Sequence, residues 1–135
     1  MRSAAALLIF GLSGAAVAVP GVPPDFLGDW VPKTSTCQSE LRFRVEAKSV
    51  VLINGSQSKS FGNLDFCYSC EGGARYNGIV VWMMPEFGGK TEAPFTAQFN
   101  AGEKVGVAKL DLQKPELKRQ FPLHQVALKR CVKKT

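Results

Sequence analysis

The stretch LRFRVEAKSVVLINGSQSKSF, residues 41–61, decides the fold class of this chain. At its start, Leu41, Phe43 and Val45 alternate with charged residues. Successive side chains of a β-strand point to opposite faces, so this alternation is typical of a strand with one buried and one solvated face. The opening of the stretch therefore predicts a half-buried β-strand.

The second half of the same stretch predicts a hairpin. Residues 50–53 form a short apolar run, Asn54-Gly55 follows, and residues 58–61 return. Asparagine and glycine both tolerate the positive φ of a type I′ turn, which makes this pair one of the strongest hairpin signals in a sequence. The stretch as a whole therefore predicts antiparallel β-structure.

The chain beyond residue 61 repeats the pattern of short strands between turns. Residues 75–84 predict the longest strand, and because both of its faces are apolar we expect another layer to cover the second face. The other predicted strands span residues 64–68, 95–100 and 104–112, and a change of parity in the last one predicts a β-bulge near Ala108.

The C-terminal part is ambiguous between helix and strand. Pro115 is expected to begin a short helical turn, because the first helical position does not use its N–H group. The apolar positions between Phe121 and Leu128 fit a helix and, with a bulge, also a strand; we expect a strand and leave the helix open. These patterns together predict an all-β fold: a single small antiparallel barrel or sandwich of about seven or eight strands, with room for a short C-terminal helix.

The N-terminal residues have the pattern of an export signal. Arg2 precedes an apolar run from Ala4 to Val17, and small residues at Ala16 and Ala18 suit a signal peptidase. The alternative, a membrane anchor, needs about 20 uninterrupted apolar residues, and prolines follow this run too soon. We therefore predict a signal peptide over residues 1–18, and a secreted or periplasmic location for the mature chain, with no membrane span.

The mature chain is expected to hold one domain. Residues 19–25 are rich in proline and predict an extended arm, and residues 26–135 predict the β-barrel domain. The formal net charge is +6 and is spread along the chain, with a denser basic cluster at the C-terminus that we interpret as a solvated tail. Because aromatic and basic residues do not interleave, we expect no nucleic-acid partner. We also expect the protein to be a monomer.

Four cysteines in an exported chain predict two disulfides, because the compartments that such signals reach are oxidising. If the first and last strands pair antiparallel, Cys37 lies near Cys131, and Cys67 is left to bond with Cys70. Alternatively, Cys67 and Cys70 face opposite sides of one strand and serve two distant partners. The pairing stays open at this level.

The spacing of Cys67 and Cys70 also fits thiol–disulfide exchange, in which the first cysteine is activated at a helix N-terminus. No helical pattern follows this pair, so a structural disulfide is the preferred interpretation. A zinc site made from the four cysteines would need free thiolates in an oxidising compartment, and we expect no metal site.

The sequence contains no recognisable catalytic motif. His124 is the only histidine, no serine or cysteine lies in a nucleophile motif, and the acidic residues show no pairing that implies acid and base roles. We therefore expect no catalytic residues and no cofactor.

The stretch around Trp82, Met84 and Phe87 is the best candidate for a ligand site. Methionine and aromatic side chains adapt to irregular apolar shapes, and two glycines follow Phe87 in the same turn. We predict a concave apolar site here; the alternative is that these side chains belong to the core.

The tripeptide Gly28-Asp29-Trp30, followed by a β-rich body, resembles the Gly-x-Trp motif of lipocalin-like barrels, in which the tryptophan plugs one end. It is also similar to the opening of small periplasmic protease inhibitors with that fold, which present an N-terminal arm to the protease. The resemblance implies partner contacts at Trp30, Pro23 and Pro24.

These observations predict an exported, soluble binding module without catalytic activity. Its partner would be an apolar small molecule, as for a ligand carrier, or a protein, as for a protease inhibitor. Two alternatives remain: a thiol–disulfide redox or chaperone protein that uses Cys67 and Cys70, and a structural component of the cell envelope.

Overall fold

The computed structural model describes Gly11 and residues 21–132. The predicted signal peptide, apart from Gly11, lies outside the described residues. Nine antiparallel strands form one sheet in the spatial order β4-β3-β2-β1-β9-β8-β7-β6-β5. The all-β prediction is confirmed, but the strand count is nine rather than seven or eight. The strands are β1 Gly28–Pro32, β2 Leu41–Val45, β3 Val50–Asn54, β4 Gln57–Phe61, β5 Asp65–Cys67, β6 Val81–Met84, β7 Phe95–Phe99, β8 Val107–Leu112 and β9 Leu128–Cys131.

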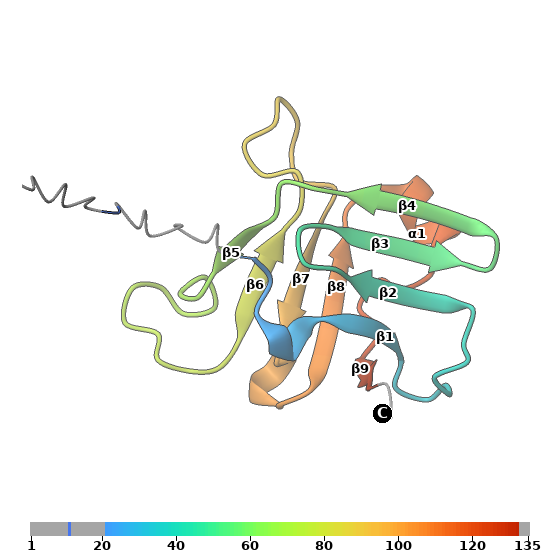
Figure 1. Cartoon of the computed structure of the whole chain (residues 1–135), viewed down its shortest axis with the longest axis horizontal. Coiled ribbons are helices and arrows are strands. Elements are labelled where there is room, and N and C mark those ends of the chain that lie inside the picture. Colours follow the sequence, from blue (N-terminus) through green and yellow to red (C-terminus); the bar gives the residue numbers. More distant parts are fainter. Residues whose placement is uncertain (1–10, 12–20, 133–135) are drawn as a thin grey trace, which may run out of the picture.

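The sheet curls into a half-barrel. Strands β1 to β4 run across the direction of strands β6 to β8 (Figure 1), and aromatic contacts between β7 and both β2 and β4 show that the two halves of the sheet face each other across the core. The first and last strands are neighbours in the middle of the sheet, where Asp29 pairs with Cys131 and Pro32 with Leu128. Strands β4 and β5, which are consecutive in the chain, form the two edges.

The inner faces of both halves are closely packed. Phe99 is fully buried, and its ring lies 4.3 Å from that of Phe26 and 5.5 Å from that of Trp30. Phe95 is also fully buried, and its ring makes edge contacts with Phe43 at 5.9 Å and Phe61 at 5.2 Å. Buried aromatic pairs of this kind stabilise a fold beyond the area they bury. Aromatic side chains from both halves of the sheet therefore join it into one core.

The stretch that decides the fold forms β2, β3 and β4 as expected, but its turn is shifted by one residue. Asn54 pairs with Gln57, so the two central turn residues are Gly55 and Ser56. Only Gly55 of these two has a positive φ, +62°. A positive φ at the first central position alone is the pattern of a type II′ turn rather than the predicted type I′ turn.

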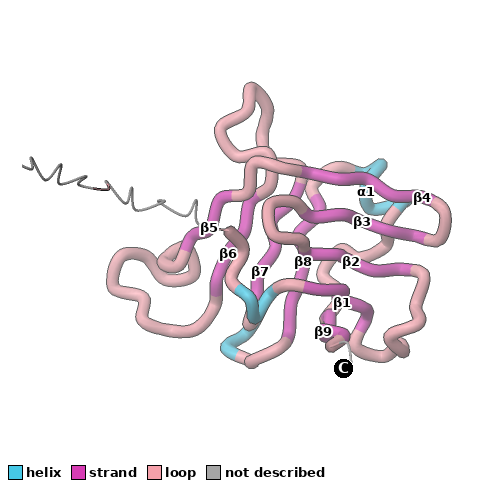
Figure 2. The backbone as a smooth tube through the Cα atoms, in the orientation of Figure 1, coloured by secondary structure: helices cyan, strands magenta, loops and turns pink. Residues whose placement is uncertain are grey.

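The predicted long strand at residues 75–84 is wrong over most of its length. Only Val81–Met84 is a strand, and residues 68–80 form a long loop between β5 and β6, which Figure 2 shows in pink at one end of β6. In place of a strand partner, the backbone N–H of Ile79 donates to Glu103 and that of Val80 to the Tyr76 hydroxyl. Side chains satisfy these backbone groups, so the segment leaves the sheet.

The predicted bulge near Ala108 is also wrong. The pairing of β7 with β8 runs without interruption from Phe95 with Leu112 to Phe99 with Ala108. The change of parity has another cause, because Val105 lies before β8 and is 83% exposed.

The C-terminal ambiguity is resolved by two short elements. A helix, α1, spans Pro115–Gln120, with Pro115 at its start as expected, and its Leu117 is buried. The strand β9 then spans Leu128–Cys131, so the preference for a strand was right only for the last part of the segment. Among residues 21–132, no helix has the length and the apolar character needed to cross a bilayer.

The part of the predicted N-terminal arm that the structure describes is packed against the domain. Val22 is buried, and its N–H donates to the carbonyl of Ala47 at 3.1 Å. A 3-10 turn over Pro24–Phe26 follows and places Phe26 in the core. Residues 21–25 therefore belong to the domain instead of extending from it, because burying Val22 and Phe26 outweighs the freedom of an arm.

Candidate functional site

Trp30 is a core residue and is not available to a partner. Its side chain is 1% exposed, and its indole Nε1 donates to the carbonyl of Phe26 at 2.9 Å. Pro23 is half-buried and Pro24, which is exposed, begins the 3-10 turn. The side chain of Trp30 points toward the inner face of the sheet, so the predicted partner contact has no exposed Trp30 surface in this structure.

Trp82, Met84 and Phe87, the residues of the predicted ligand site, line neither of the two surface depressions described below. Trp82 and Met84 are half-buried on the outer face of β6, whereas Met83 between them is fully buried in the core. Phe87 lies beyond the end of β6 and is 56% exposed. Trp82 instead joins the β5–β6 loop, because its indole Nε1 donates to Glu71 at 2.9 Å.

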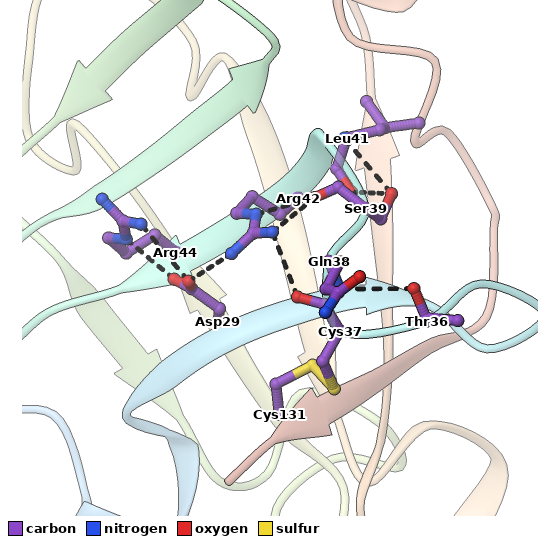
Figure 3. Close-up of a disulfide and its surroundings, with 9 residues drawn as sticks. All are labelled: Asp29, Thr36, Cys37, Gln38, Ser39, Leu41, Arg42, Arg44 and Cys131. Carbon is purple, nitrogen blue, oxygen red and sulfur yellow. Dashed lines mark hydrogen bonds and ion pairs between the residues drawn. A yellow bond between two sulfur atoms is a disulfide. The ribbon is translucent and has the colours of Figure 1, made fainter. Parts of the chain in front are cut away.

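Two surface depressions lie on the outer face of the half of the sheet that contains β1 to β4. Arg42 and Arg44 line both of them, and Asp29 lines the one that reaches β9. Asp29 accepts hydrogen bonds from Arg42 Nη1 at 2.8 Å and from Arg44 Nε at 2.7 Å (Figure 3). The bond from Arg44 is the main cause that lowers the pKa of Asp29. Burial is the next largest effect and opposes it, and the bond from Arg42 lowers the pKa further.

The Arg42 guanidinium has a structural role. It also donates to the carbonyls of Ser39 at 2.9 Å and Cys37 at 3.1 Å, so it holds the segment that carries the disulfide between Cys37 and Cys131 (Figure 3). Most of its N–H groups are occupied by protein acceptors. Arg42 and Asp29 therefore fasten the β1–β2 connection rather than present a free cation to a ligand.

The β5–β6 loop, residues 68–80, has an unusual composition for this chain. It contains both tyrosines of the protein, three glycines and one arginine. Tyr68 is 60% exposed and Ile79 is 40% exposed. Arg75 is exposed at a turn in which the N–H of Tyr76 donates to the carbonyl of Gly73. Tyrosine and glycine are enriched in binding loops, and tyrosine and arginine are enriched among the residues that dominate binding energy.

Several contacts fasten this loop at both of its ends. The disulfide between Cys67 and Cys70 closes the first turn of the loop, and the hydrogen bond from Trp82 to Glu71 holds the residue after that turn against β6. At the far end, Glu103 accepts hydrogen bonds from the Tyr76 hydroxyl and from the N–H of Ile79. The loop is therefore anchored to its neighbours at both ends.

The hydrogen bond between Tyr76 and Glu103 changes the pKa of both side chains. The hydrogen bond from the Ile79 backbone, followed by the one from Tyr76, lowers the pKa of Glu103. Partial desolvation, followed by the bond to Glu103, raises the pKa of Tyr76. Glu103 is consequently ionised at neutral pH and Tyr76 is protonated, which is the combination that this hydrogen bond requires.

The cysteines and the histidine have surroundings that fit structural roles. Cys67 lies at the end of β5 and is disulfide-bonded to Cys70, and no helix begins there, so the helix N-terminus that thiol–disulfide exchange uses is missing at this pair. His124 Nδ1 accepts a hydrogen bond from the N–H of Leu112 at 3.0 Å, so this nitrogen is unprotonated. Its approach to Asp111 at 3.6 Å is therefore not an ion pair in this tautomer.

The β5–β6 loop was not among the predicted sites, because the apolar residues within 75–84 have the pattern of a strand. Gly72, Gly73, Asn77 and Gly78 are the signal that argues for a loop, since these residues are disfavoured inside strands. Within the described part of the chain, no group of three His, Cys, Asp or Glu residues is arranged to hold a metal ion. Comparison with models of protein families, with curated proteins and with solved structures finds no match.

Proposed function

We propose that this chain is an exported module that binds a protein partner through the β5–β6 loop. The observation that carries the proposal is the exposure of Tyr68, Arg75 and Ile79 on a loop that a disulfide and several side-chain hydrogen bonds hold in place. Tyrosine and arginine are over-represented among the residues that dominate protein–protein binding energies. The loop places them where a partner surface has access to them.

The anchoring of the loop favours binding because it lowers the entropy lost on association. Ordering a flexible loop costs about 0.5–1.5 kcal/mol for each immobilised side chain, and a loop that is already fixed avoids part of this cost. Glu71 and Glu103 use their carboxylates for this anchoring. The exposed side chains of Tyr68 and Arg75 remain for the partner.

A protein partner is favoured over an apolar ligand held inside the barrel. A carrier of the lipocalin kind needs space between the two halves of its sheet. Here fully buried side chains, Phe43, Phe95 and Phe99 among them, occupy the inner face. The β5–β6 loop projects from the body of the domain instead (Figure 1), which suits contact with another macromolecule.

Two features support export to an oxidising compartment, which means a secreted or periplasmic location. The signal-like sequence at residues 1–18 is one of them. The other is the pairing of all four cysteines as two disulfides, Cys37 with Cys131 and Cys67 with Cys70.

Site-specific photocrosslinking tests the proposal. A benzoylphenylalanine placed at Tyr68 is expected to give one discrete adduct in the native host, and the same probe at Lys48, an exposed site in another turn, is expected to give none. The partner, once identified by mass spectrometry, is then titrated with the purified protein. Tyr68→Ala with Arg75→Ala is expected to weaken the affinity at least about tenfold, as for residues that dominate an interface.

The controls separate loss of binding from loss of folding and from redox chemistry. The two probe variants and the double alanine variant must keep the far-UV circular dichroism spectrum of the wild type. Equal adducts from the two probe sites, or an unchanged affinity of the double variant, would rule out this loop as the partner surface. Catalytic reduction of insulin by the wild-type protein would instead favour the thiol–disulfide alternative.

A further inference from the structure

Strand β4, Gln57–Phe61, is an edge of the sheet, and its free side is open. Residues 57–60 are all exposed. In a hairpin with two central residues, the flanking pair, here Asn54 and Gln57, is hydrogen-bonded, and the bonded pairs then alternate along the strand. The N–H and C=O groups of Ser58 and Ser60 therefore point away from β3. They are available to a further strand.

The two faces of this edge have different chemistry. On the outer face, Ser58 lies opposite Ile53, and Ser60 lies opposite Val51. Both apolar side chains are half-buried, and they line a depression of about 930 Å³ on this face. Because serine is small, the apolar side chains behind it stay accessible from the edge.

On the inner face of the same edge, the exposed residue is a cation. Lys59 shares this face with the core residue Leu52, and its Nζ lies 5.8 Å from the centre of the Phe61 ring. Within residues 21–132, no carboxylate forms an ion pair with Lys59. An added strand would place one side chain directly beside this ammonium group.

We propose that β4 accepts an extended segment of a partner protein as a tenth, antiparallel strand. The segment carries the pattern apolar–acidic–apolar. Its two apolar residues lie opposite Ser58 and Ser60 and cover Ile53 and Val51, and its acidic residue lies opposite Lys59. The backbone groups of Ser58 and Ser60 then form four hydrogen bonds with the segment, as in other cases of strand addition. This surface is separate from the β5–β6 loop, so the inference stands apart from the function proposed above.

A second copy of this chain fits the edge poorly. The antiparallel register that uses both Ser58 and Ser60 of each copy places Lys59 directly opposite Lys59 of the other copy. Like charges in this position are destabilising. Shifting the register to avoid the repulsion pairs only one serine of each copy, Ser58 or Ser60, with a serine of the other β4 strand. The charge on this edge therefore selects against self-association and in favour of an acidic segment.

Titration with short synthetic peptides tests the inference. The probe is a capped heptapeptide with Val-Glu-Val at its centre, and its matched control has Val-Lys-Val. Amide hydrogen exchange is followed by NMR. With the first peptide, the amides of Ser58 and Ser60 are expected to become protected, whereas that of Lys59, which already bonds to β3, is expected to change little.

Variants of the edge give two further readouts. Ser58→Pro removes a donor that faces the peptide and leaves the bonds to β3 intact, so it is expected to abolish binding, whereas Ser58→Ala is expected to retain it. Lys59→Glu is expected to weaken binding of the Val-Glu-Val peptide by up to about fivefold and to strengthen that of the Val-Lys-Val peptide.

Three results would overturn the inference. The first is no protection of Ser58 and Ser60 at millimolar peptide. The second is equal binding by Ser58→Pro and Ser58→Ala, each shown to be folded by its NMR spectrum. The third is protection of both amides that grows with protein concentration in the absence of peptide, which would identify a second copy as the occupant.

Discussion

The two disulfides are expected to differ strongly in what they contribute to stability. A disulfide stabilises mainly by restricting the unfolded chain, and the effect grows with the length of the loop that it closes. For the 94-residue separation of Cys37 and Cys131, the chain-entropy relation gives about 4.7 kcal/mol at 25 °C. For the separation of 3 between Cys67 and Cys70, it gives about 1.6 kcal/mol.

The comparison uses two double variants, Cys37→Ser with Cys131→Ser and Cys67→Ser with Cys70→Ser. The free energy of unfolding is measured by urea denaturation, with the fluorescence of Trp30 and Trp82 as the signal. We expect the first variant to lose about 2–3 kcal/mol more than the second. We also expect a larger m-value for the first variant, because its unfolded chain is no longer compacted by the long cross-link.

The folded state of the long-loop variant is expected to persist because other contacts hold the same segment. Arg42 still binds the carbonyl of residue 37, and β1 still pairs with β9. If its stability is too low in buffer, both variants are measured in the same concentration of trimethylamine oxide, which favours the compact state of each. Equal losses for the two variants, or a larger loss for the short loop, would refute the argument from loop length.

Three other predictions concern single groups. Asp29→Asn is expected to lower the free energy of unfolding by about 1–2 kcal/mol at neutral pH. Because the folded protein has a lowered pKa at Asp29, the stabilisation by its carboxylate is complete above about pH 4 and is lost as the pH falls through that lowered pKa. Denaturation curves of wild type and variant should therefore converge in acid, and a constant gap would contradict this. In a Tyr68→Phe background only Tyr76 titrates as a tyrosine, and its absorbance at 295 nm should give a pKa above the usual value of about 10. Glu103→Gln should lower this pKa. If the pKa does not fall, the hydrogen bond between Tyr76 and Glu103 is contradicted. Phe99→Ala is expected to cost about 3–5 kcal/mol in thermal or urea unfolding, because the ring is fully buried and contacts other aromatic rings, and a loss below about 1 kcal/mol would contradict this packing.

Strand positions with a clear alternation were predictable from the sequence. In β2, Phe43 and Val45 are buried and the two arginines are on the other face, as the period of two requires. The helical start at Pro115 was equally local, because the restricted φ of proline already fits a first helical turn.

The β5–β6 loop shows where local patterns fail. The apolar residues from Ile79 to Met84 read as one strand, yet Ile79 is 40% exposed and only Val81–Met84 pairs in the sheet. The N–H of Ile79 donates instead to the carboxylate of Glu103, which is 24 residues away. Spacing between neighbours holds no information about such a contact.

The sequence by itself determined the all-β class, the half-buried faces of the strands and the presence of enough cysteines for two disulfides. These properties follow from backbone geometry, which repeats every two residues in a strand, and from composition. Only the tertiary structure decided that β1 lies beside β9, which brings Cys37 to Cys131, and that β4 is left as an open edge. Those outcomes depend on which distant strands exchange hydrogen bonds while their apolar faces share one core, and that choice is made by the chain as a whole.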